Sequence, residues 1–143
     1  MLNSFTDCFY RISVKALILD DQHGFLLTKE ANSMWELPGG GLEHGELPQD
    51  GLAREIREEM GLTITAIEQQ PSYFLTAVTT INDQVIHFAN VIYRTTVRNL
   101  DFSPSDECVE IRFFTTEDVL KEKNCYSNVV EFAKVYRGRN TTT

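Results

Sequence analysis

The sequence predicts a single layered α/β domain. Short segments rich in β-branched and apolar residues stand on both sides of a glycine-rich turn and an amphipathic helical segment, and further helical patterns lie near the C-terminus. The chain has 143 residues, of which 42% are hydrophobic, and this is enough for one domain with a substantial core. Because the sequence shows no internal repeat and no linker, we expect residues 1–143 to form one domain.

The chain is acidic, with a formal net charge of −8 at pH 7. Sequence-independent binding to long nucleic acids needs a basic surface, so the charge balance argues against a nucleic-acid scaffold. An acidic protein can still bind a polyphosphate when metal ions screen its carboxylates. The charge therefore does not argue against an enzyme that acts on a small nucleotide.

The sequence favours a cytoplasmic protein that does not cross a membrane. No stretch approaches the roughly 20 apolar residues that are needed to span a bilayer, and the N-terminal residues MLNSFTDCFYR lack the basic and apolar segments of a secretory signal. The three cysteines, Cys8, Cys108 and Cys125, are odd in number and widely separated. We expect them to be reduced thiols, because their spacing fits neither a disulfide framework nor a metal site.

Two strands are predicted before the glycine-rich turn. Residues 8–19 (CFYRISVKALIL) are mostly β-branched and apolar, and residues 25–29 form a second short strand after a turn at residues 20–24. Residues 31–34 are expected to form a loop. Trp35 is the only tryptophan, and we expect it to pack beneath the glycine-rich turn rather than to stack on a base.

A helix is predicted over residues 48–60. Pro48 suits the first turn of a helix, because its missing N–H would have no partner there, and Gly61 is a natural stop. The apolar residues recur at helical spacing and define one buried face; they are Leu52, Ala53, Ile56 and Met60. The preceding glycines at 39–41 allow the backbone to turn tightly and to approach a ligand closely.

Three carboxylates lie together on this predicted helix. Glu55, Glu58 and Glu59 have the spacing i, i+3, i+4, which makes them neighbours on one side of a helix. Such carboxylates repel one another, and a bound divalent cation would remove the repulsion. Mg²⁺ and Mn²⁺ prefer oxygen ligands and usually act beside substrate phosphates. A solvated, salt-bridged helix would explain the charge density but not the glycine-rich turn, so the pattern predicts a metal site for phosphate chemistry.

The C-terminal half predicts a hairpin, one more strand and two helices. Residues 73–81 and 84–97 are rich in β-branched and aromatic residues and flank an Asn-Asp turn at 82–83. A polar loop follows over 98–106, and residues 105–114 lead into another strand. A short helix capped by Thr115 or Thr116 is expected to run to Lys123, and a last helix from 127 to 137. We expect residues 139–143 to form a frayed, disordered tail.

Residues 40–62 (GGLEHGELPQDGLAREIREEMGL) resemble the box of the Nudix hydrolase family, G-x5-E-x7-R-E-U-x-E-E-x-G-U, where U is apolar. Every specified position matches, from Gly40 and Glu46 through Arg54 to Leu62, and the common preceding Pro-Gly is present as Pro38 and Gly39. Nine positions at fixed separations are far more specific than a lone glycine motif. The resemblance implies the Nudix fold, a mixed β-sheet sandwiched between α-helices (an α/β/α sandwich).

The resemblance also implies a metal site for Mg²⁺ or Mn²⁺. The metal ligands would be Glu55, Glu58 and Glu59, with the main-chain carbonyl of Gly39 as an additional oxygen. Glu46 and Arg54 would orient these ligands, because an arginine that reaches back to a carboxylate ties the glycine-rich loop to the helix.

Three further residues are candidates by resemblance. Glu58 is our first choice for the base that acts on water, and Glu107, in the loop before the last strand, competes with it; Glu110 is a second choice in that loop. An exposed loop carboxylate is as good an explanation of Glu107, because the box does not fix its position. Lys29 is a candidate phosphate contact, although a solvated lysine at a strand end is the default.

The implied reaction is hydrolysis of a nucleoside diphosphate linked to another group X. The substrate is open among nucleoside triphosphates (including oxidised ones), nucleotide sugars, dinucleoside polyphosphates, and cofactors such as NAD or coenzyme A. The small size of the chain favours a nucleoside triphosphate or a similarly small nucleotide. Two alternatives remain: a catalytically silent nucleotide sensor, which we would expect to have lost box carboxylates, and an RNA-end or RNA-cap pyrophosphohydrolase, which should carry a basic track. The protein could be a monomer or a homodimer.

Overall fold

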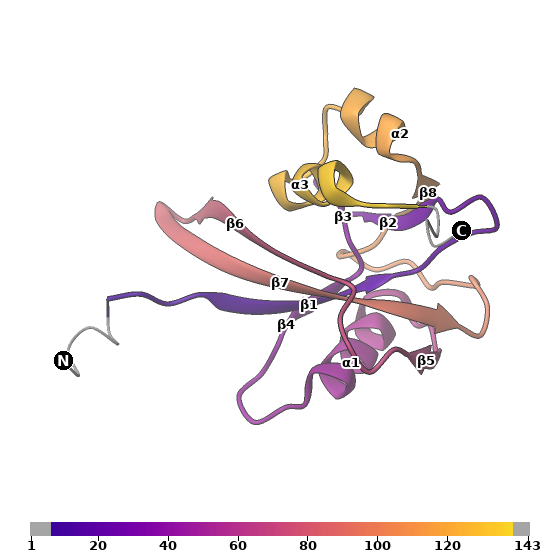
Figure 1. Cartoon of the computed structure of the whole chain (residues 1–143), viewed down its shortest axis with the longest axis horizontal. Helices are drawn as coiled ribbons and strands as arrows, with labels where there is room; N and C mark the ends of the chain where they lie inside the picture. The colour runs from indigo at the N-terminus through magenta and orange to yellow at the C-terminus, as the bar shows by residue number, and fades with distance from the viewer. Residues whose placement is uncertain (1–6, 139–143) are drawn as a thin grey trace.

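The computed structural model describes residues 7–138, and this part of the chain forms eight strands and three helices (Figure 1). The elements in chain order are β1 (Arg11–Leu17), β2 (Phe25–Lys29), β3 (Trp35–Glu36), β4 (Gly39–Gly41), α1 (Pro48–Met60), β5 (Ile64–Ile67), β6 (Tyr73–Ile81), β7 (Gln84–Val97), β8 (Glu110–Phe114), α2 (Thr116–Lys121) and α3 (Ser127–Val135). No helix within residues 7–138 is long and apolar enough to cross a membrane.

A mixed five-stranded sheet is organised around β7. The strand order is β4-β1-β7-β5, and β6 also pairs with β7. The β1–β7 pair is parallel, with Ser13 opposite Asn90, whereas the other pairs are antiparallel. The predicted β6–β7 hairpin is confirmed, and its turn residues Asn82 and Asp83 have positive φ angles of 49° and 64°, as a tight two-residue hairpin turn requires.

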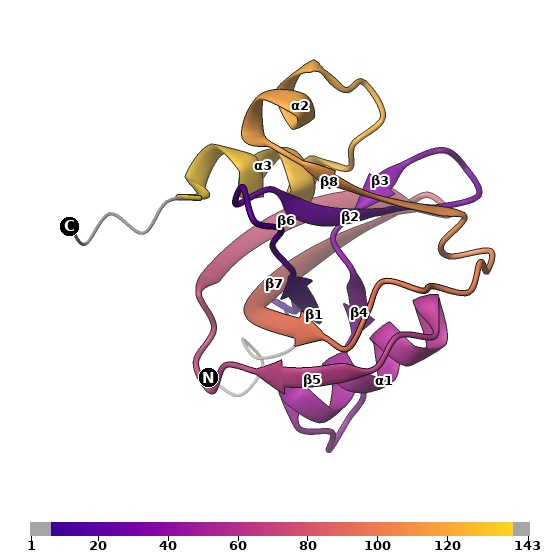
Figure 2. The same ribbon diagram turned by 90° about the vertical axis from the view of Figure 1, so that its right-hand side faces the viewer.

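A second, antiparallel sheet has the order β3-β2-β8. Helix α1 lies on one side of the strands, and α2 and α3 lie on the opposite side, over β2 and β8 (Figures 1 and 2). The sandwich of strands between helices is therefore confirmed, although the strands divide into two sheets rather than one.

Two hydrophobic clusters fill the space between these layers. One packs α2 and α3 against the strands and contains Phe25, Trp35, Phe114 and Phe132; the other packs α1 against the opposite side and contains Val14, Leu52, Ile56 and Met60. Trp35 is 3% exposed and its ring meets Phe114 at 4.8 Å between centroids. Its packing role is thus as expected, but the packing partners belong to the cluster below the C-terminal helices.

Several predicted boundaries are wrong. The first strand spans Arg11–Leu17 rather than 8–19, α2 ends at Lys121, and α3 ends at Val135 because Tyr136 adopts extended backbone. The region of the glycine-rich turn contains two short strands that we did not predict, β3 and β4. Gly39–Gly41 pairs with β1, which a glycine run can do at a sheet edge where little side-chain packing is required. The predicted tail at 139–143 lies outside the described residues.

Candidate active site

Helix α1 presents one buried face and one acidic face. Pro48 occupies its first turn, and the helix ends at Gly61, whose left-handed φ of 69° lets its N–H donate to the carbonyl of Arg57. The apolar face packs into the core through Leu52, Ile56 and Met60, which are all 0% exposed. This packing fixes the rotation of the helix and directs its carboxylates towards the glycine-rich strand β4.

Arg54 joins four parts of the site. Its Nε donates to Oε2 of Glu46 at 2.7 Å and its Nη2 to Oε1 of Glu46 at 2.9 Å, so the pair is bidentate. Its Nη1 donates to Glu55 at 2.9 Å and to Glu58 at 3.2 Å, and Nη2 reaches the Gly41 carbonyl at 3.3 Å. The hydrogen bonds from Arg54 hold the pKa of Glu46 at about 2. The guanidinium thus ties the loop that carries Glu46 to the helix that carries the other carboxylates.

Glu59 is the buried carboxylate of the site. It is 4% exposed, and its Oε1 accepts a hydrogen bond from the Gly39 N–H at 3.2 Å. Burial raises the pKa of Glu59 to about 8, while the nearby ammonium of Lys15 acts in the opposite direction. A carboxylate in such a place binds a proton or a cation more readily than an exposed one, which is what a metal ligand requires.

Gly40 leaves room for Glu55. A Cβ atom on residue 40 would lie 2.5 Å from Oε2 of Glu55, so any other side chain here would displace that carboxylate. Gly39 is restricted in another way, since its φ is +127° and a Cβ would collide with the main-chain oxygen of Val14. The glycines therefore let neighbouring groups approach the backbone closely, in addition to allowing it to turn.

The oxygen-only character of this donor set fits a hard divalent cation such as Mg²⁺ or Mn²⁺. Glu55, Glu58, Glu59 and the Gly39 carbonyl are the residues that would hold it. Among residues 7–138, no three acidic, histidine or cysteine side chains are gathered in metal-binding geometry. In this arrangement Arg54 holds Glu55 and Glu58, and the Gly39 N–H holds Glu59.

The loop before β8 lies beside Glu59. Glu107 contributes to raising the pKa of Glu59, after the larger effect of burial, and the hydroxyl of Ser105 donates to the main-chain oxygen of Glu59 at 2.8 Å. The structure thus brings the loop that carries Glu107 beside Glu59. Lys29 is engaged elsewhere, because its Nζ lies 3.7 Å from a carboxylate oxygen of Glu110, its partner across the β2–β8 pair.

Lys15 is a site residue that the sequence analysis missed. It is 5% exposed, and its Nζ donates to the carbonyls of Leu37 at 3.3 Å and Gly39 at 3.4 Å and lies 3.8 Å from the Glu36 carboxylate. A single lysine inside the apolar segment ISVKALIL was a signal that could have identified it, because lysine is almost never fully buried without partners.

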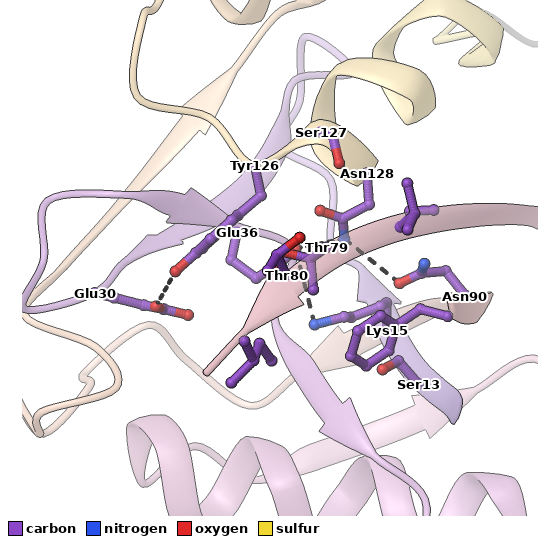
Figure 3. Close-up of a pocket in the computed structure, with 14 residues that line it drawn as sticks. Ser13, Lys15, Glu30, Glu36, Thr79, Thr80, Asn90, Tyr126, Ser127 and Asn128 are labelled. Carbon is purple, nitrogen blue, oxygen red and sulfur yellow. Dashed lines mark hydrogen bonds and ion pairs between the residues drawn. The ribbon is translucent and has the colours of Figure 1, made fainter. Parts of the chain in front are cut away.

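A cavity of about 350 Å³ adjoins Lys15 on the side of the sheet opposite α1 (Figure 3). Its polar lining comes from β1, the loop after β2, β3, β7 and the start of α3, and Thr79 and Thr80 of β6 form one rim. Its polar and charged lining residues include Ser13, Lys15, Glu30, Glu36, Asn90 and Asn128. Because Lys15 also contacts the Gly39 carbonyl, the cavity and the carboxylate site share one side chain. The size is at the lower end of the range for small-molecule sites.

Two carboxylates of the cavity are held by hydrogen bonds. The Tyr126 hydroxyl donates to Glu30 at 2.8 Å, and burial raises the pKa of Glu30 although that hydrogen bond acts against it. The amide of Asn128 donates to Glu36 at 2.7 Å. The sequence analysis predicted neither the residues of these hydrogen bonds nor Asn90. Of them, only Asn90 was marked in the sequence, because it is a polar residue inside the apolar run FANVIY of β7.

A family model described as "NUDIX domain" matches residues 9–132. Among curated proteins, the "Nucleoside triphosphatase NudI" of Enterobacter sp. (strain 638) is 32% identical over 113 residues, covering 71% of this chain and 80% of that protein. A "MutT-like protein" of Streptomyces ambofaciens is 38% identical over 60 residues, and an "RNA pyrophosphohydrolase" of Ruthia magnifica subsp. Calyptogena magnifica is 41% identical over 59 residues. Each match covers 41% of this chain but only 39% and 33% of the respective relative.

Solved structures show the same fold. The MutT protein from Methanosarcina mazei Go1 superposes with a TM-score of 0.68 at 25% identity, covering 87% of this chain and 91% of the other. A putative nudix hydrolase family member from Chromobacterium violaceum gives a TM-score of 0.65 at 23% identity, covering 94% of this chain and 82% of the other. The second likeness, below 25% identity, concerns the fold alone.

Proposed function

Because the chain belongs to the Nudix hydrolase family, we propose that it is a metal-dependent hydrolase that cleaves the phosphoanhydride bond of a nucleoside diphosphate linked to another group. The observation that supports this best is the arrangement around Arg54. One guanidinium contacts Glu46, Glu55 and Glu58, and thereby aligns the acidic face of α1 with the glycine-rich strand β4. A purely structural salt-bridged helix would not need this contact to the glycine-rich strand or the buried Glu59 beside it.

The residues of the site have different proposed roles, which depend on where they lie. Glu55, Glu58, Glu59 and the Gly39 carbonyl would hold Mg²⁺ or Mn²⁺, and the ion would supply neutralisation of charge on the phosphate oxygens and Lewis acidity for the attack of water. Glu46 and Arg54 orient these ligands. In the reaction a water oxygen bonds to phosphorus, the bridging P–O bond breaks, and the products are a nucleoside monophosphate and phospho-X, or a related split.

Glu58 is the proposed base. Its side chain is 58% exposed, against 17% for Glu55, and Glu59 is buried, so Glu58 is the box carboxylate with the freest access to a water molecule. Glu107 is the competitor, because the loop that carries it packs against Glu59 through Ser105. A base must reach the attacking water within hydrogen-bond distance. Substituting Glu58 and Glu107 one at a time shows which of them acts as the base.

The substrate proposed is a small nucleotide. The cavity beside Lys15 has room for a nucleoside-sized group, and Lys15 connects it to the carboxylate site. A relative that matches this chain over 113 residues is named a nucleoside triphosphatase. Nucleoside triphosphates, nucleotide sugars and dinucleotides are the candidates, and Lys29 would contact phosphate only if it left Glu110.

An RNA-end pyrophosphohydrolase is the second candidate, since several relatives that match this chain over about 60 residues carry that name. Three cations next to the site already have partners in the described part of the chain, which gives little support to a free basic track. Lys15 is bonded to two carbonyls, Arg54 to carboxylates, and Lys29 lies against Glu110. A silent sensor is a third possibility, which the retention of Glu55, Glu58 and Glu59 disfavours.

The test is product release from a panel of nucleotides and a 5′-triphosphate RNA with Mg²⁺ or Mn²⁺, using wild type and Glu58→Gln. We expect one nucleotide class to be hydrolysed and the variant to lose about a hundredfold or more in kcat. Glu131→Gln, which changes an exposed glutamate on α3, is the matched control and should retain activity. Preferred cleavage of the RNA would favour the second candidate, and binding without cleavage would favour the sensor.

A further inference from the structure

Asn90 carries a buried donor that has no partner. The residue lies in the middle of β7 and is 2% exposed. Among residues 7–138, its Nδ2 is the buried side-chain nitrogen or oxygen atom that makes no hydrogen bond. Buried polar groups in native structures are nearly always paired, and an unpaired one in a pocket wall points to an external partner.

A chain of hydrogen bonds fixes the direction of this donor. Oε1 of Glu36 accepts from the Leu37 N–H at 2.8 Å and from Nδ2 of Asn128 at 2.7 Å. Because an ionised carboxylate can only accept, the amide of Asn128 must present its nitrogen to Glu36. That nitrogen also donates to Oδ1 of Asn90 at 3.4 Å. The oxygen of Asn90 is therefore held by Asn128, and its nitrogen is left for a ligand (Figure 3).

A second possible donor stands beside Asn90. Ser13 is directly opposite Asn90 in the parallel β1–β7 pairing, and both residues line the cavity. A carbonyl oxygen has two lone pairs and can accept from both side chains, whereas a ring nitrogen has one lone pair and can accept from only one. Two adjacent donors therefore favour a carbonyl oxygen.

The surroundings disfavour a phosphate at this position. Glu30 and Glu36 also line the cavity, and the ammonium of Lys15 is already shared among Glu36 and two main-chain carbonyls. With two carboxylates and one ammonium in its lining, the cavity disfavours an anion and can accept a neutral group. The remaining lining is largely apolar and includes Ala77, Val78, Ile81 and Phe88, which suits the faces of a planar ring.

We propose that Asn90 donates a hydrogen bond to a carbonyl oxygen of the substrate's nucleobase, so that the cavity selects oxo-bearing bases, guanine, uracil or thymine, over adenine. This assignment rests on the proposed function, because it places the base of the cleaved nucleotide in this cavity. Ser13 supplies the second donor, and Glu36 and Asn128 are positioning residues that act through Asn90.

The decisive comparison uses substrates that differ in this oxygen. GTP and 2-aminopurine riboside 5′-triphosphate have the same sugar, phosphates and 2-amino group, but the second lacks the oxygen at C6 and the N1–H that accompanies it; the Asn90→Leu variant assigns the difference to the oxygen. We expect wild type to favour GTP by at least about tenfold in kcat/KM, since a site built to hydrogen-bond one group rejects the analogue that lacks it. ATP should be as poor as the analogue, and equal values for the three nucleotides would overturn the assignment.

Asn90→Leu removes the donor at similar volume. We expect its kcat/KM for GTP to fall about tenfold or more and its value for the 2-aminopurine analogue to stay within about threefold of wild type. A purely structural role would lower both values together. Glu36→Gln should also reduce the preference, because a neutral amide no longer dictates the orientation of Asn128. The control is Asn124→Leu, an exposed asparagine outside the cavity, which should keep the wild-type ratio.

Direct binding separates this inference from the proposed function. Calorimetry with GDP and with 2-aminopurine riboside 5′-diphosphate reports the same preference without hydrolysis. If no nucleotide is cleaved but GDP binds about tenfold more tightly than the analogue, the hydrolase proposal fails and the carbonyl-recognition proposal stands. If triphosphates are cleaved but both diphosphates bind equally, or if neither binds, the role of Asn90 is wrong.

Discussion

The carboxylate site and the cavity lie within reach of the same lysine, yet they are built in opposite ways. The carboxylate site comes from one continuous segment, with its glycines in β4 and its carboxylates on α1. The cavity takes its side chains from five elements, β1, β3, β6, β7 and α3, and from loops between them, and the hydrogen bond between Glu36 and Asn128 joins residues 92 positions apart. The first site is local chemistry on a helix, and the second exists only when the whole fold is assembled.

This difference has an energetic counterpart. Glu46, Glu55 and Glu58 are held by Arg54, which is itself partly exposed, and only Glu58 among these three carboxylates is exposed. A partly exposed ion-pair network of this kind contributes modestly to stability but fixes geometry. The cavity side is buried and contains a lysine and a carboxylate that depend on each other. Substitutions on the helix should therefore change activity more than stability, and substitutions on the cavity side should change both.

Of the substitutions that test this comparison, Arg54→Lys is expected to have the largest effect on activity. A lysine keeps the charge but cannot donate in parallel to both oxygens of Glu46 while also reaching Glu55 and Glu58. Loss of such an orienting contact typically lowers activity by about 10- to 100-fold, and we expect the melting temperature to change little. Steady-state kinetics and thermal unfolding measure both. Arg57→Lys is the control on the same helix, because Arg57 is exposed, and an equal loss there would refute the assignment.

Lys15→Met tests the side chain that contacts both the carboxylate site and the cavity. Removing the ammonium leaves the Glu36 carboxylate and the carbonyls of Leu37 and Gly39 without their buried partner, so we expect a loss of about 2–3 kcal/mol in the free energy of unfolding. Mg²⁺ should then raise the melting temperature of the variant more than that of wild type, because the fixed positive charge near Glu59 is gone. A smaller Mg²⁺ effect in the variant would show that Lys15 supports metal binding instead.

The helix was predictable because its information is local. The spacing of Glu55, Glu58 and Glu59, the helix stop at Gly61 and the start at Pro48 all follow from neighbours along the chain. The hairpin was predictable for the same reason, since Asn82 and Asp83 tolerate the left-handed conformation of its turn.

The cavity could not be predicted, because tertiary pairing decides which residues meet there. Ser13 and Asn90 are neighbours only through the parallel pairing of β1 with β7, and nothing in either segment encodes that register. Lys29 shows the converse: its position before the box suggested a phosphate contact, but strand pairing places Glu110 beside it. The strand β4 was missed because three glycines carry no β propensity of their own.

The raised pKa of Glu59 predicts that the free energy of unfolding of the metal-free protein depends on pH. Burial raises its pKa from an ordinary value of about 4.5 to about 8, so the folded state binds its proton more tightly than the unfolded state does. This contribution to stability is fully present below about pH 4.5 and is lost as the pH rises through about 8. Glu59→Gln, which stays neutral, should be more stable than wild type by about 1–2 kcal/mol above pH 8 in EDTA. Urea unfolding at several pH values measures the difference, and a gap that does not change with pH would contradict it.

The lowered pKa of Glu46 predicts a pH dependence of stability that is opposite in sign to that of Glu59 and smaller. Hydrogen bonds from Arg54 lower its pKa from an ordinary value of about 4.5 to about 2, so the folded state prefers the ionised form. The resulting stability is present above about pH 4.5 and is lost as the pH falls through about 2. Wild type should therefore exceed Glu46→Gln in its urea midpoint near neutral pH, and the gap should close in acid. If the two carboxylates gave pH dependences of the same sign, the contrast between a buried residue and an arginine-paired one within a single site would be wrong.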